Sequence, residues 1–78
     1  MSETTDKLTE CTQRIADSQI AIGAAMHACE ALTAAMISEG FHDWRPGAAG
    51  WDLRTAESVV NGAARRIEQI VETGPLTT

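Results

Sequence analysis

Uncharged residues follow a seven-residue repeat through the first half of the chain. Leu8, Ile15, Ile22, Cys29 and Met36 occupy one position of the repeat, and Cys11, Ser18, Ala25 and Leu32 lie three residues after the first four of them. We call these the a and d positions, because a repeat of this kind is typical of helices that pack along a seam. We therefore predict a helix from about residue 6 to 39, with Thr5 or Asp6 as N-cap and Gly40 at its end.

The second half repeats the pattern over a shorter length. Leu53, Val60 and Ile67 are its a positions, and Ala56, Ala63 and Ile70 are its d positions. Asp52 is a suitable N-cap and Gly74-Pro75 a strong stop, which predicts a helix from about 52 to 73, a loop over 40–51 and a polar tail over 74–78. Most of the d positions are small, namely Cys11, Ser18, Ala25, Ala56 and Ala63, so the two helices can approach closely. The predicted fold is all-α, an antiparallel helical hairpin in a single domain spanning 1–78.

The first predicted helix is apolar on more than one side. A second stripe of alanines, bracketed by Ile20 and Ile37, runs beside the a/d seam. One shorter helix cannot cover both stripes, and the first turns of the longer helix should project past it. We therefore expect dimerisation into a four-helix bundle. The alternative is that exposed alanine is simply tolerated. The residues predicted for the oligomer seam are Ile15, Ile20, Ile22, Ala24, Ala28, Ala31 and Ala35.

Composition narrows the functional classes. The chain has 78 residues and a formal charge of −5, which disfavours direct nucleic-acid binding. Its two cysteines lie 18 residues apart on one predicted helix and cannot pair within a monomer. We see no apolar run of signal-peptide or membrane-spanning length, and expect a cytoplasmic protein without membrane contact. The preference for arginine over lysine and the abundant alanine suggest a bacterial or phage source.

The predicted loop is the richest segment in groups that bind partners. All three aromatic residues lie in it, beside histidine and arginine. Aromatic and arginine side chains dominate binding hot spots, and long loops are often functional. The alternative is that the aromatic rings fold over the open end of the hairpin and close its core. The candidate partner-binding residues are Phe41, His42, Trp44, Arg45 and Trp51.

Other chemistry has weaker support. His42 and Asp43 are adjacent, without a nucleophile or a third group, so we do not expect an enzyme. Cys11, His27, Cys29 and His42 show no zinc-ligand spacing, and we expect both cysteines to pack in the seam; no metal or cofactor is predicted. Four arginines could form an anion-recognising surface in an oligomer, namely Arg45, Arg54, Arg65 and Arg66.

Three functions remain open at this point. The leading hypothesis is a non-enzymatic, oligomeric protein–protein interaction module, an adaptor or an inhibitor that a bacterium or phage directs at a host enzyme or defence complex. The first alternative is an oligomer that sequesters a small anionic, nucleotide-like ligand. The second alternative is a structural assembly subunit.

Overall fold

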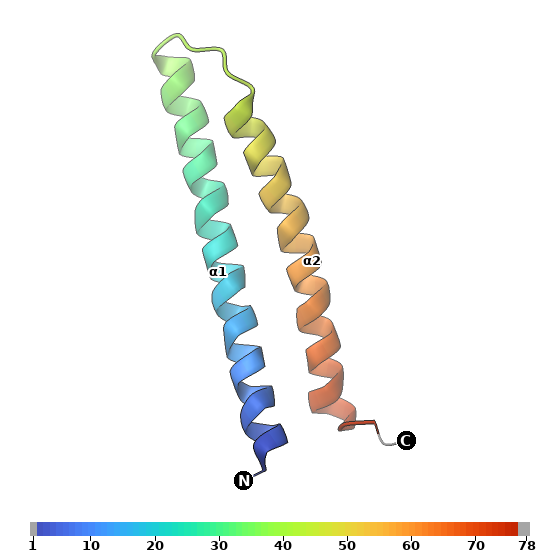
Figure 1. Ribbon diagram of the computed structural model, residues 1–78. Helices are drawn as coiled ribbons and strands as arrows, with labels where there is room; N and C mark the ends of the chain where they lie inside the picture. The colour runs from blue at the N-terminus through green and yellow to red at the C-terminus, as the bar shows by residue number, and fades with distance from the viewer. Residues whose placement is uncertain (1, 77–78) are drawn as a thin grey trace.

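Two long helices joined by a short connection make up the computed structural model, which describes residues 2–76. Helix α1 spans Glu3–Ser38 and helix α2 spans Arg45–Thr73. The helices run antiparallel and side by side over nearly their whole length, with both termini at the end opposite the connection (Figure 1). The predicted all-α helical hairpin is confirmed.

The start of α1 lies earlier than predicted. Ser2 is the N-cap, and its hydroxyl accepts a hydrogen bond from the backbone N–H of Thr5 at 3.1 Å. The prediction placed the cap at Thr5 or Asp6, although Ser2 satisfies the same chemistry three residues upstream. The helix then continues without a break through Gly23, because a single glycine costs a helix only about 1 kcal/mol.

The start of α2 is the larger correction, since the predicted loop over 40–51 is wrong. Residues 39–44 connect the helices, and α2 begins seven residues before Asp52, the predicted cap. Pro46 lies in the first turn, where proline is favoured because its missing N–H would have no helical partner. The run Pro-Gly-Ala-Ala-Gly resembles a loop, yet no positive backbone φ occurs within it, and Gly50 at its end lies close to Cys29 of α1.

The earlier start makes α2 long enough to run beside most of α1. Near the open end of the hairpin, Thr12 and Ile15 share a groove of about 370 Å³ with Ile67, Val71 and other residues of α2. Ile15 therefore lies against α2, so the expectation that the first turns of α1 project past the second helix is wrong at this residue.

The surface between the helices uses only half of the predicted seam. The a positions named above are half-buried in both helices. Gly50 is also half-buried, as are five residues that lie four positions after an a residue: Gln19, Met26, Thr33, Glu57 and Ala64. Most d positions, which lie three residues after the a positions, are exposed instead. Heptad spacing locates an apolar sector of a helix, but the flank that a single neighbour covers depends on how the two helices are rotated.

The hairpin buries very little of its own surface. Among residues 2–76 Pro46 alone is buried, and large apolar side chains such as Ile20 and Trp44 are 73% and 77% exposed. The accessible surface is 6250 Å², whereas a compact protein of this mass would expose roughly 4,600 Å². The shape explains the excess, because the molecule measures 59 × 21 × 14 Å.

The hydropathy of α1 is higher than expected from the sequence pattern. A stretch of 18 residues within it has a mean hydropathy of 1.6, so by length and composition the helix could span a membrane. The sequence-based expectation that no run reaches membrane-spanning length is therefore wrong. Core helices of soluble proteins and N-terminal signal sequences meet the same criterion, although none of this stretch is buried within the hairpin.

Candidate protein-binding site at the connecting end

The connection begins with a glycine-based helix cap. Gly40 has a φ of 86°, the N–H of Gly40 donates to the carbonyl of Ile37 at 3.0 Å, and the N–H of Phe41 donates to the carbonyl of Met36 at 2.8 Å. These two hydrogen bonds define a Schellman motif, in which the residue after the glycine commonly touches the last helical turn. The prediction that Gly40 ends the helix is confirmed.

An aspartate–arginine pair holds the other side of the connection. Asp43 accepts a hydrogen bond from the backbone N–H of Arg45 at 2.9 Å and binds the guanidinium of Arg45 through both carboxylate oxygens. The shortest of these contacts joins Nη2 of Arg45 to Oδ2 of Asp43 at 2.6 Å. The hydrogen bonds from Arg45 lower the pKa of Asp43 from 3.8 to about 2. Asp43 therefore orients the first turn of α2, a role that the sequence analysis missed.

The aromatic residues of the connection are displayed rather than packed away. Phe41 is 55% exposed and Trp44 is 77% exposed. Together with His42 they border a shallow hollow of about 320 Å³, whose floor includes Met36 and Ile37 of α1. The alternative in which these rings close the core is wrong, because neither ring is buried.

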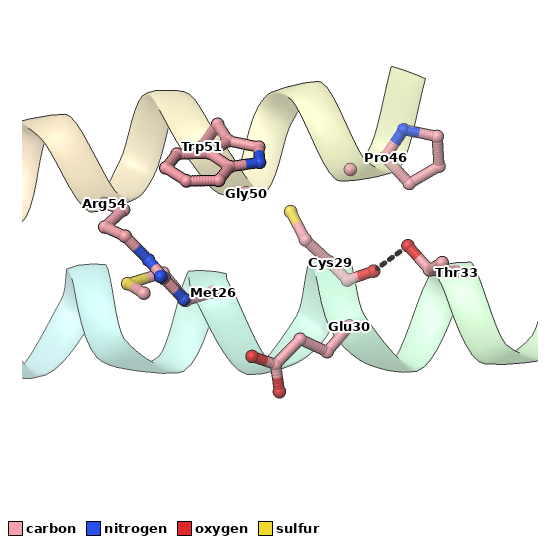
Figure 2. A pocket seen from close by; sticks show the side chains of 9 residues that line it. Met26, Cys29, Glu30, Thr33, Pro46, Gly50, Trp51 and Arg54 are labelled. Carbon is pink, nitrogen blue, oxygen red and sulfur yellow. Dashed lines mark hydrogen bonds between the residues drawn. The ribbon is translucent and has the colours of Figure 1, made fainter. Parts of the chain in front are cut away.

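Trp51 belongs to a different part of the surface from the one predicted. It lies in the second turn of α2 rather than in a loop, and it is 68% exposed. Its ring and the Arg54 guanidinium form a cation–π pair, with 5.3 Å from the Arg54 Cζ to the ring centroid. Figure 2 shows Arg54 reaching across from α2 toward Met26, along the wall of a groove of about 190 Å³.

The same groove shows how closely the helices approach. Cys29 points at α2 opposite Gly50, and a Cβ built on Gly50 would lie 4.0 Å from the Cβ of Cys29 (Figure 2). Glu30 also lines the groove and carries a negative charge, so this hollow lacks the uniformly positive lining that an anion prefers.

The four candidate arginines do not converge within one hairpin. Arg45 is engaged by Asp43 and Arg54 by Trp51. At about 1.5 Å per residue, Arg65 and Arg66 lie roughly 16–18 Å farther along the helix than Arg54. An anion site built from all four would need a second subunit, and that prediction remains untested.

The groups considered for catalysis or metal binding are also dispersed. Within residues 2–76 no three His, Cys, Asp or Glu side chains form a group that could hold a metal ion. Nδ1 of His27 lies 3.6 Å from Oε2 of Glu30, and both side chains are largely exposed. Cys29 is half-buried, but Cys11 is exposed, which corrects the expectation that both cysteines pack in the hairpin seam.

The predicted oligomer seam falls on more than one face of α1. Ile15 and Ile22 are half-buried against α2, whereas Ile20 and the alanines are exposed. From the helical repeat, Ala24, Ala28, Ala31 and Ala35 point away from α2; we call these four residues the outer alanine stripe.

Comparison with known proteins identifies no relative, because no family model, curated protein or solved structure matches the chain.

Proposed function

We propose that this chain is a non-enzymatic interaction module that acts as a homo-oligomer and uses its connecting end to bind another protein. The observation that carries the proposal is the absence of a core within residues 2–76, where large apolar side chains stay open to water. Exposed apolar surface on this scale is typical of proteins that bind partners. A cytoplasmic adaptor or inhibitor of bacterial or phage origin is the setting we expect.

The connecting end is the part of the surface best suited to a second protein. Trp44 and Phe41 present large rings beside the polar His42, and the backbone beneath them is held by the Gly40 cap and the Asp43–Arg45 pair. A preorganised aromatic cluster binds with a small loss of conformational entropy. No described contact favours the anionic-ligand alternative in the same way.

The test uses the full chain as an affinity bait in a lysate of the cells that express it. Wild type, Trp44→Ala and Val71→Ala are compared, because Val71 is an apolar residue, 62% exposed, near the opposite end of the hairpin and serves as a control remote from the connection. We expect wild type and Val71→Ala to retain the same partner. For the purified partner we expect Trp44→Ala to bind roughly 30-fold more weakly, the loss typical of a hot-spot residue. Retention of no partner by wild type, or equal retention by Trp44→Ala, would contradict the proposal.

A further inference from the structure

One broad face of the hairpin is formed by a and d positions of both helices. In α1 the exposed d positions include Leu32, which is 51% exposed, and in α2 they include Ile70, which is 37% exposed. Helical geometry in an antiparallel pair places the d positions of both helices on one side. The two grooves between the helices open on the other side, and no d-position residue lines them.

No a or d position of α1 or α2 is charged, and the g positions that border this face include Arg14, Asp52 and Arg66. Continuing the repeat to the start of α2 adds Pro46 and Ala49, and the face then comprises Leu8, Cys11, Ile15, Ser18, Ile22, Ala25, Cys29, Leu32 and Met36 of α1, with Pro46, Ala49, Leu53, Ala56, Val60, Ala63, Ile67 and Ile70 of α2. Ser18 is its most polar side chain. The opposite side carries Arg54, Arg65 and Glu68 along α2. We call the uncharged surface the a/d face.

Large a residues alternate with small d residues over positions 8–25 of α1 and 49–67 of α2. The hydrogen bond from Gln19 Nε2 to Asn61 Oδ1, at 2.9 Å, and the approach of Cys29 to Gly50 set the register of the two helices. In this register Ala25 and Ser18 lie near the levels of Ala56 and Ala63 in the middle of the hairpin. Small side chains there allow a facing surface to come close.

We infer that a second copy of this chain covers the a/d face, giving a four-helix bundle whose core is built from the a and d positions. This inference rests on the oligomeric part of the proposed function and names the surface that is used. It differs from the seam predicted from sequence, because the outer alanine stripe stays on the outside of the bundle.

The size of the face fits a second copy. The 59 Å length and 21 Å width of the hairpin bound a face on the order of 1,200 Å², and a stable interface needs about 800 Å² from each partner. An uncharged face of this kind also resembles the apolar interfaces of obligate homodimers, rather than the more polar surfaces of transient complexes. Because residues 2–76 enclose no core of their own, the chain needs a covering partner as it folds, and a second copy is present wherever the chain is made.

A pair of adjacent alanines provides the test. Ala25 lies on the a/d face, whereas Ala24 is exposed on the outer alanine stripe. Ala25→Glu, Ala24→Glu and wild type are compared by light-scattering mass and by the dependence of the thermal midpoint on protein concentration. Ala63→Glu provides a second variant on the a/d face, and Ala63 is exposed in the single hairpin, so the change does not disturb contacts between α1 and α2.

We expect wild type and Ala24→Glu to have twice the 8.3 kDa mass of one chain. The dimer dissociation constants of Ala25→Glu and Ala63→Glu should be at least 100-fold higher than that of wild type, and both variants should lose helix content on dilution.

If Ala24→Glu alone dissociates the oligomer, the inference about the a/d face is overturned while the proposed oligomeric module stands. A folded wild-type monomer that still binds its partner through Trp44 overturns the inference and leaves the role of the connecting end intact. Transfer of wild type into neutral phosphatidylcholine vesicles, with loss of the dimer, would also overturn it.

Discussion

The connection and the paired helices of this hairpin are stabilised in opposite ways. Between Met36 and Pro46 the backbone is held by local hydrogen bonds, a glycine cap and a two-residue ion pair. Along the paired helices, half-buried a positions face each other and none of them except Pro46 is buried. The connection is therefore complete within one chain, whereas the paired helices need a further surface to exclude water from their apolar residues.

The largest expected effect tests the paired helices with two adjacent valines. Val60 is half-buried at an a position, and Val59 is 68% exposed on the outside of α2. Val60→Asp should cost more than about 3 kcal/mol, because it places a charge in an apolar seam, and this small protein should then lose most of its helical circular dichroism signal. Val59→Asp should change the free energy of unfolding by less than about 0.5 kcal/mol. Equal losses in the two variants would show that the a positions are not the stabilising seam.

An intermediate effect is expected at the glycine cap of the connection, and a glycine inside α1 serves as its control. Gly40→Ala should destabilise the protein by about 1 kcal/mol, because Gly40 has a φ of 86°. Gly23→Ala should stabilise it by about 1 kcal/mol, because Gly23 is helical and a Cβ there meets nothing within 4 Å. Urea midpoints at one fixed protein concentration measure both changes. A loss of stability in Gly23→Ala would mean that another surface packs against that position.

The smallest effect concerns the ion pair of the connection. The folded-state pKa of Asp43 is about 2, below its usual value of 3.8, so its contribution to stability is present above about pH 4 and is lost as the pH falls from 4 to 2. Carboxyl-carbon NMR should show Asp43 titrating with a midpoint near 2. In Arg45→Gln the midpoint should rise toward the usual value, because the guanidinium that stabilises the carboxylate is gone. An unchanged midpoint in that variant would rule out Arg45 as the cause.

Much of the local structure was predictable because it depends on neighbouring residues. The glycine at position 40 and the stop at Gly74-Pro75 predicted the ends of both helices. The start of α2 was not predicted, because Pro46-Gly47 is compatible with a turn or a first helical turn, and packing of Gly50 on Cys29 favours the helix. The candidate site changed accordingly, since Trp51 moved from the loop to α2 and only Phe41, His42 and Trp44 remain in the connection.

The sequence by itself determined that the chain is helical, where α1 and α2 end, and that the a positions face a neighbour. Those features follow from backbone propensity, caps and the spacing of apolar residues along one chain. Only the tertiary structure decided that most of the d positions stay exposed and that they share one face. The reason is that heptad spacing gives the direction of an apolar sector on each helix, whereas the rotation of two helices against each other depends on contacts between residues far apart in the chain.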